Sequence, residues 1–193
     1  INWQRRELNL KIVYYGPALS GKTTNIEQIY ARVNPKRRGE LVSLKTAEDR
    51  TLYFDFLQIE LGTINGLTPK IHLYTVPGQS YYAASRKIVL RGADGVVFVA
   101  DSGIDRLKAN VQAWQDMQAH LTAHRIPLQG FPLVVQFNKR DLPRAVSTPV
   151  LKQVLRVNKA PTLEAVAVQG QGVFDTFKII INQVIRRVQQ EAA

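Results

Sequence analysis

Apolar residues recur along this chain with two periods, one typical of strands and one typical of helices. Short runs rich in Val, Ile, Phe and Tyr predict strands, whereas apolar residues spaced three or four apart predict amphipathic helices. These patterns predict strands at residues 8–15, 51–61, 71–76, 95–100, 131–137 and 162–168. They predict helices at residues 22–33, 83–90, 105–124, 149–157 and 173–188.

The alternation of strands and helices predicts an α/β fold with a mostly parallel sheet of about six strands and helices on both faces. The dipeptide Asn65-Gly66 is a strong hairpin signal, so residues 51–61 are expected to form one antiparallel edge strand. Residues 36–50 are polar, basic and aperiodic, which predicts a long loop. No linker or internal repeat interrupts residues 1–193, so we expect one domain.

Composition narrows the class of protein. The 193 residues include no cysteine, which excludes disulfides, thiolate zinc sites and cysteine nucleophiles. No apolar stretch is long enough for an integral membrane segment, and the first residues do not resemble a signal peptide, so we expect a cytoplasmic protein. The net charge of +11 is compatible with an anionic partner, including nucleic acid.

A glycine-rich loop follows the first predicted strand and precedes the first predicted helix. Residues 16–23, GPALSGKT, match the phosphate-binding pattern G-x-x-x-x-G-K-[ST]. Backbone N–H groups of such a loop surround phosphate oxygens, Lys22 reaches the β- and γ-phosphates, and the Thr23 hydroxyl binds Mg²⁺. The residues expected to contact the nucleotide here are Gly16, Pro17, Ala18, Leu19, Ser20, Gly21, Lys22, Thr23 and Thr24.

A second motif, Asn138-Lys139-Arg140-Asp141, directly follows the strand predicted at 131–137. A carboxylate in the place of Asp141 can accept hydrogen bonds from both N1–H and the exocyclic amino group of guanine. Adenine offers no such pair of donors and would leave the carboxylate unpaired. We therefore expect Asn138, Lys139 and Asp141 to select guanine, which disfavours an ATPase or kinase.

These motifs, in this order, resemble the MglA family of bacterial Ras-like small GTPases. The stretches that carry the resemblance are KIVYYGP, LSGKTTN, DRTL, HLYTVPGQ, VFVADS and NKRDLP. The resemblance covers nearly the whole chain and implies a P-loop small GTPase fold that binds GTP/GDP and Mg²⁺ and hydrolyses GTP. It also implies an MglB-like roadblock-domain activating protein as partner, motility or polarity effectors, and recruitment by partners to a cell pole.

The resemblance assigns further residues to the reaction. Gln79 corresponds to the residue that orients the attacking water, and Arg50 to an intrinsic arginine finger. Thr51 corresponds to the switch threonine that binds Mg²⁺ and senses the γ-phosphate, to which Gly78 would donate its N–H. Val166 and Ala167 are expected in the last guanine loop, where the N–H of Ala167 would contact the base.

One position departs from the Ras pattern. Ras-like proteins usually carry Asp-x-x-Gly, in which the Asp holds a magnesium-bound water, but this chain has Thr75 in that place. A hairpin at Asn65-Gly66 would pair residues whose numbers sum to about 131, bringing Asp55 to within about one residue of Thr75. We expect Asp55 to support the magnesium site together with Thr75; the alternative is a polar residue on the solvated face of an edge strand.

Two other functions remain open on the sequence alone. Thr75 is compatible with an interaction scaffold that binds nucleotide with little turnover, although Gln79 and Thr51 argue against it. The positive charge is compatible with a nucleic-acid-binding protein, but the basic residues are dispersed along the chain without interleaved aromatic residues, so no specific nucleic acid is expected as a partner.

Overall fold

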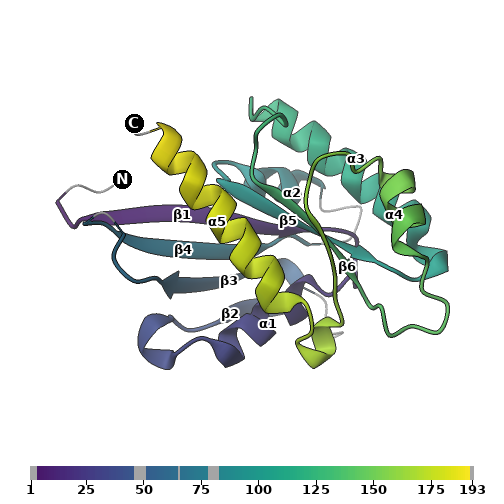
Figure 1. The fold of residues 1–193 in the computed structure, drawn as a ribbon, viewed down its shortest axis with the longest axis horizontal. Helices are drawn as coiled ribbons and strands as arrows, with labels where there is room; N and C mark the ends of the chain where they lie inside the picture. The colour runs from purple at the N-terminus through teal and green to yellow at the C-terminus, as the bar shows by residue number, and fades with distance from the viewer. Residues whose placement is uncertain (1–3, 46–50, 65, 78–82, 192–193) are drawn as a thin grey trace.

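The computed structural model describes residues 4–45, 51–64, 66–77 and 83–191, with the backbone alone at residues 44–45, 51–53 and 83. Within these residues, the strands form one sheet in the order β2-β3-β4-β1-β5-β6-β7 (Figure 1). Their bounds are β1 Glu7–Tyr15, β2 Val42–Lys45, β3 Thr51–Glu60, β4 Thr68–Thr75, β5 Gly95–Asp101, β6 Leu133–Asn138 and β7 Thr162–Glu164. The helices are α1 Lys22–Arg32, α2 Ala83–Leu90, α3 Leu107–Ala123, α4 Thr148–Leu155 and α5 Val173–Glu191.

The expected α/β sheet is confirmed, with two corrections. Seven strands are present instead of about six, because β2 lies within the segment that was expected to be a loop. As a result β3, which is antiparallel to both β2 and β4, is not the edge strand. The pattern missed β2 because a strand of four residues with one lysine is too short to show alternation.

The strand expected at 162–168 is also shorter than predicted. It ends at Glu164, and a 3-10 turn at Ala167–Gln169 follows. Val166 and Gln171 exchange two backbone hydrogen bonds of 3.1 and 3.2 Å, which close a tight loop before α5. The apolar run therefore continues into a buried loop and not into a longer strand.

Parallel pairing brings the ends of several strands to one edge of the sheet. β1 pairs in parallel with both β4 and β5, and β5 pairs in parallel with β6. In this register Asp101, the last residue of β5, lies beside Asn138, the last residue of β6. Because ligands of such sheets bind at the carboxyl ends of the strands, this edge is where the candidate site lies.

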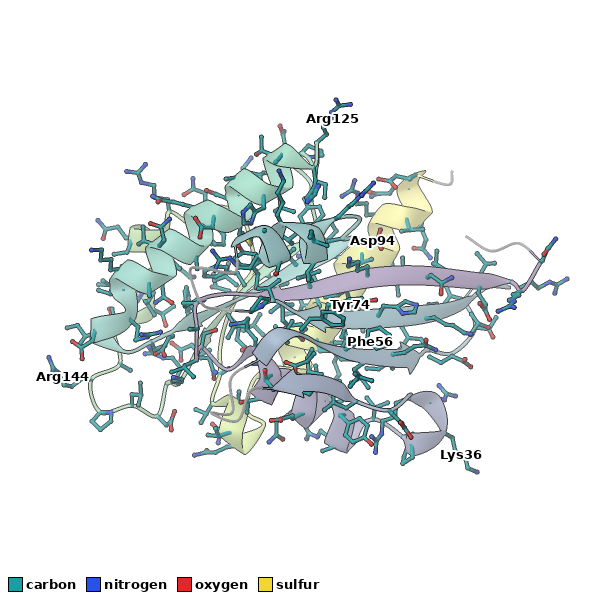
Figure 2. All side chains as sticks on the ribbon, turned by 180° about the vertical axis from the view of Figure 1, so that it is seen from behind. Lys36, Phe56, Tyr74, Asp94, Arg125 and Arg144 are labelled. Carbon is teal, nitrogen blue, oxygen red and sulfur yellow. The ribbon has the colours of Figure 1, made fainter. Side chains whose placement is uncertain are left out.

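The hairpin between β3 and β4 turns at the expected place. Ile64 and Leu67 exchange backbone hydrogen bonds of 2.7 and 3.0 Å across the two intervening residues. Further along the hairpin, the rings of Phe56 and Tyr74 lie next to each other, with 5.0 Å between their centroids (Figure 2). Phe56 pairs with Tyr74 across the two strands, so the residue before it in β3, Asp55, lies opposite Thr75, the residue after Tyr74 in β4.

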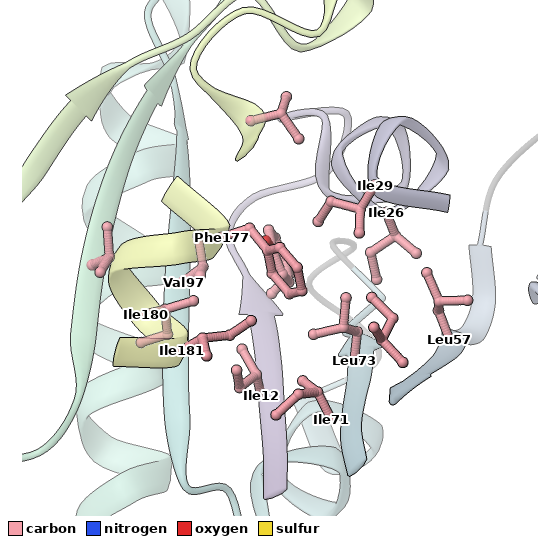
Figure 3. Packing of buried hydrophobic residues seen from close by; sticks show 14 of the residues in the cluster. Ile12, Ile26, Ile29, Leu57, Ile71, Leu73, Val97, Phe177, Ile180 and Ile181 are labelled. Atoms are coloured by element: carbon pink, nitrogen blue, oxygen red, sulfur yellow. The ribbon is translucent and has the colours of Figure 1, made fainter. Parts of the chain in front are cut away.

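Two apolar cores cover the two faces of the sheet. On one face, α1 and α5 pack on the sheet through Ile26, Ile29, Phe177 and Ile180, all of them buried (Figure 3). On the other face, α2, α3 and α4 contribute Val89, Leu90, Trp114, Met117, Leu121, Leu151 and Leu155. In the described part of the chain, no helix combines the length and apolar character that a membrane crossing requires.

Candidate functional site

The glycine-rich loop passes so close to neighbouring backbone and side chains that two of its glycines have no room for a side chain. A Cβ on Gly16 would lie 2.2 Å from the carbonyl oxygen of Val99. A Cβ on Gly21, whose φ is +99°, would lie 2.2 Å from Nδ2 of Asn138. The two motifs found in the sequence are thus in direct contact, and α1 begins at Lys22 immediately after this loop.

Lys22 is buried beneath the loop. Its ammonium group donates to the carbonyl oxygens of Pro17 at 2.7 Å and Gly16 at 3.2 Å. Burial lowers the pKa of Lys22 to about 7, while the nearby Asp55 carboxylate acts in the opposite direction. Phosphate groups beside this amine would favour its charged form in the same way.

Asp55 is at the centre of a buried polar cluster that also includes the side chains of Thr23, Ser43 and Thr75. Its carboxylate accepts hydrogen bonds from the hydroxyls of Thr23 at 2.6 Å and Thr75 at 2.7 Å. Its N–H donates to the Thr75 hydroxyl at 2.8 Å, and its second carboxylate oxygen accepts from the hydroxyl of Ser43 on β2. Asp55 is 0% exposed, so the alternative of a solvated polar residue is excluded.

The expected proximity of Asp55 and Thr75 is therefore present. A buried carboxylate needs several hydrogen bonds or a cation to offset its desolvation. Three oxygen-bearing side chains, those of Thr23, Asp55 and Thr75, meet beside the Lys22 end of the phosphate loop. Oxygen ligands of this kind suit Mg²⁺.

Asn138 joins the phosphate loop to the last loop of the site. Its Nδ2 donates to the carbonyl of Ser20 at 2.8 Å, and its Oδ1 accepts from the N–H of Ala167 at 2.9 Å. Asn138 is 2% exposed, and its side chain connects the end of β6 with two segments that are distant in sequence, at Ser20 and at Ala167. The backbone N–H of Ala167, expected to face the base, is engaged by Asn138 in this structure.

Next to Asn138 is a cavity of about 170 Å³ whose lining comes from all three loops. Lys139, Asp141 and Ala167, all expected from the sequence to bind the base, are among the residues that line it. Its lining residues are Leu19, Gly21, Thr24, Asn138, Lys139, Asp141, Leu142, Ala167 and Val168. Val166 is not among them, since it is buried in the loop closure with Gln171.

Four residues with predicted roles lie wholly or partly outside the described residues. Arg50, Gly78 and Gln79 lie outside the described residues. Thr51 begins β3, where its backbone pairs with Lys45 of β2, but its side chain also lies outside what is described. Their expected roles rest on the sequence alone.

Two residues of the site were not expected from the sequence. Asp101 is 2% exposed, and its carboxylate accepts a hydrogen bond of 2.7 Å from the ammonium of Lys139. Arg106 lies 3.7 Å from the same carboxylate and donates to the carbonyl of Ala18 at 2.7 Å. Asp101 and Arg106 thus hold Lys139 and the phosphate loop. The position of an acidic residue at the end of a buried strand was the available signal for Asp101.

A second unexpected feature is a buried amide pair beneath the loops. Asn25 of α1 and Gln136 of β6 exchange hydrogen bonds of 2.8 and 2.9 Å, and both are 0% exposed. Asn25 also donates to the carbonyl of Gly21, and Gln136 donates to the hydroxyl of Thr176 on α5 at 3.0 Å. Since Thr176 donates onward to the carbonyl of Gly172, this chain of hydrogen bonds connects the phosphate loop with the loop that precedes α5.

A phosphate loop, a buried cluster of oxygen ligands and an Asn-Lys-x-Asp cavity at one sheet edge define a P-loop guanine-nucleotide-binding protein. Residues 2–184 match the family model of the ADP-ribosylation factor family. The chain is 48% identical over 190 residues to mutual gliding-motility protein MglA of Myxococcus xanthus, covering 98% of this chain and 97% of that protein. It is 28% identical to ADP-ribosylation factor-like protein 2 of Drosophila melanogaster over 190 residues, covering 96% and 92% of the two chains.

The chain therefore belongs to the ADP-ribosylation factor family and is an MglA-like small GTPase. It is a GTP-binding switch that hydrolyses GTP, and the scaffold and nucleic-acid readings are not favoured.

Proposed function

We propose that this GTPase is a switch that regulates cell polarity and surface motility. The observation that carries this proposal is the 48% identity, over almost the whole of both chains, to a protein named for gliding motility. The proposal treats residues 1–193 as a single G domain, located in the cytoplasm and recruited to a cell pole by its partners.

Nucleotide recognition is proposed to divide between the two loops that meet at Asn138. Gly16–Gly21 and Thr24 surround the phosphates with backbone N–H groups, and Lys22 adds its positive charge. Lys139 and Asp141 bind the nucleoside, with Asp141 accepting from guanine. Asp101 holds the Lys139 ammonium in place at 2.7 Å, which supports this assignment.

The residues proposed to hold Mg²⁺ are Thr23, Thr51, Asp55 and Thr75. The donor set fits a hard cation, because the Asp55 carboxylate is buried and is within 2.7 Å of two hydroxyls. When bound, the ion neutralises phosphate charge. Asp55 supplies the carboxylate that Thr75 lacks, and Thr75 orients it by bonding to both its N–H and its side chain.

For the hydrolytic step we propose that Gln79 orients the attacking water and that Arg50 neutralises the charge that develops between the β- and γ-phosphates. Gly78 donates its N–H to the γ-phosphate, and Lys22 stabilises the same charge from the loop side. The resemblance to the MglA family supports these four assignments.

Val166 and Ala167 are proposed to complete the base site. Ala167 lines the cavity, and the backbone hydrogen bonds between Val166 and Gln171 hold the loop behind it.

The activating partner is proposed to be an MglB-like roadblock-domain protein, and motility or polarity effectors would bind the GTP form. The test is binding of a purified roadblock-domain dimer to the protein loaded with GDP or with a non-hydrolysable GTP analogue, measured by calorimetry. Binding that prefers the GTP form and accelerates single-turnover hydrolysis is expected. Equal binding to both forms, with no acceleration, would contradict the proposed partner.

A further inference from the structure

A groove of about 650 Å³ lies at the end of the sheet where β6 and β7 begin, opposite the end that carries the nucleotide loops. It is bounded by α3, by the segment leading into β6, by the loop between α4 and β7, and by the second half of α5. The strands β6 and β7 begin at this edge, whereas the guanine-binding residues follow their ends. The groove is therefore separated from the nucleotide by the length of the sheet.

The groove is lined both by apolar side chains and by exposed basic side chains. Trp114 and Phe131 form part of the lining and are 7% exposed, while Leu128 on the rim is 42% exposed. A hollow of this size with aromatic lining can take up several side chains of a ligand. A flat charged surface would not offer such an apolar recess.

Positive charge gathers on this groove from two elements that are far apart in sequence. Arg156 and Lys159 come from the α4–β7 loop, and Arg186 and Arg187 come from α5. No aspartate or glutamate is among the described residues that line the groove. These basic residues are dispersed along the sequence, so their clustering could not be predicted from it.

Three of these cations are available for a ligand. Arg187 pairs with Glu191 at 2.8 Å and lies over the ring of Phe131, 5.7 Å from its centroid. Arg156, Lys159 and Arg186 are exposed, and none of them forms an ion pair with a described acidic residue. The charge of the rim is thus not neutralised from within this part of the chain.

Arg156 also occupies a backbone position that disfavours it. It is the residue after α4 and has φ +54° and ψ +42°, the left-handed conformation in which helices usually carry glycine. Its guanidinium group is on the rim of the groove, where a carboxylate would meet it.

We propose that this groove docks an acidic segment of a partner protein that also carries a large apolar side chain. Carboxylates of the segment pair with Arg156, Lys159 and Arg186, and the apolar side chain fills the recess between Trp114, Leu128 and Phe131. The groove and the nucleotide site are at opposite ends of the strands, so such a partner binds without covering the nucleotide. The proposal does not depend on the role in motility.

The test uses the GDP-loaded protein and a short fluorescent peptide in which glutamates flank a Leu-Phe pair, with binding followed by anisotropy. The triple variant Arg156→Glu, Lys159→Glu, Arg186→Glu should weaken binding by about tenfold or more, since it reverses all three unpaired rim charges. The matched control, Lys108→Glu, Lys152→Glu, Lys178→Glu, changes the net charge equally at exposed lysines outside the groove and should change affinity by less than about twofold. Unchanged GDP binding by both variants verifies that they fold.

A single substitution separates binding from stability. Arg156→Gly should raise the midpoint of thermal unfolding, because glycine accepts the left-handed conformation, and yet weaken the peptide several-fold. Equal weakening by the groove and control triples would overturn the proposal, as would no binding of the peptide at all. Binding of a single-stranded oligonucleotide or an anionic lipid vesicle through the same three residues, without the peptide, would also overturn it.

Discussion

The hydroxyl of Thr75 both donates to and accepts from Asp55. It donates to the Asp55 carboxylate at 2.7 Å and accepts from the Asp55 N–H at 2.8 Å. The threonine that stands where Ras-like proteins usually carry aspartate is thus bonded to an aspartate on the neighbouring strand. In this chain the carboxylate is on β3, and it accepts a hydrogen bond of 2.6 Å from the Thr23 hydroxyl.

The first prediction concerns this carboxylate. Asp55→Asn should raise the Mg²⁺ concentration needed to retain GDP by about tenfold or more, because it removes a buried charge from the oxygen cluster. The measurement is the rate of release of a fluorescent GDP against Mg²⁺ concentration. Glu60→Gln, an exposed position on the same strand, is the matched control and should leave the curve unchanged. An Asp55→Asn curve that overlays the unmodified protein would remove Asp55 from the metal site.

The second prediction concerns the amide pair between Asn25 and Gln136. Asn25→Leu or Gln136→Leu alone should lower the free energy of unfolding by about 1–3 kcal/mol, because each leaves its buried partner unsatisfied. The double variant should recover much of this loss, since neither amide is left. Urea unfolding of the four proteins measures the coupling. Additive losses would show that the two amides do not act as a pair.

The third prediction concerns base selection. Asp141→Asn should weaken guanine nucleotides by about 2–3 kcal/mol, because a charged acceptor is lost. It should also relax the rejection of xanthine nucleotides, whose carbonyl the new amide can donate to. Competition between GDP and xanthosine diphosphate measures both effects. An unaltered preference would mean that Asp141 does not contact the base, although it lines the cavity.

The fourth prediction concerns acid sensitivity. Burial lowers the pKa of His120, whose ring contacts the hydroxyl of Tyr15 at 3.2 Å, and the charge of Arg86 lowers it further. The unfolded chain therefore binds the proton more readily, so the free energy of unfolding should fall as the pH drops below the ordinary value of 6.5. His120→Gln should flatten this part of the stability curve, measured by urea unfolding between about pH 5 and 7.5. An unchanged slope would show that His120 titrates alike in both states.

Local patterns in the sequence were sufficient to predict most elements of this fold. The 3.6-residue period placed α2 at its observed bounds, Ala83–Leu90. The Asn65-Gly66 turn and the two-residue period of strands placed Asp55 beside Thr75, because a hairpin fixes the register of both its strands. The expected sum of 131 was off by one, since the pairs from Phe56 to Glu60 sum to 130.

Contacts between distant segments could not be predicted in the same way. β2 is stabilised by its pairing with β3 and carries little pattern of its own. Asn25 and Gln136 are 111 positions apart in the sequence, and only the folded structure shows that their amides meet. Arg106 reaches Ala18 across 88 positions, a contact that depends on where the turn before α3 is placed on the sheet edge.

We propose that this chain hydrolyses GTP with its own catalytic residues. In the proposed mechanism Gln79 and Arg50 act on the transition state, so their loss should spare nucleotide affinity and slow the reaction.

Single-turnover hydrolysis of GTP, with and without a roadblock-domain dimer, distinguishes an arginine supplied by this chain from one supplied by the partner. Gln79→Leu and Arg50→Ala should each slow the stimulated rate by about 100-fold or more and leave GTP affinity within a few-fold. Replacing surface arginines of the partner should not affect the rate. An essential arginine in the partner, with Arg50 dispensable, would show that the partner supplies the arginine and that Arg50 is not catalytic.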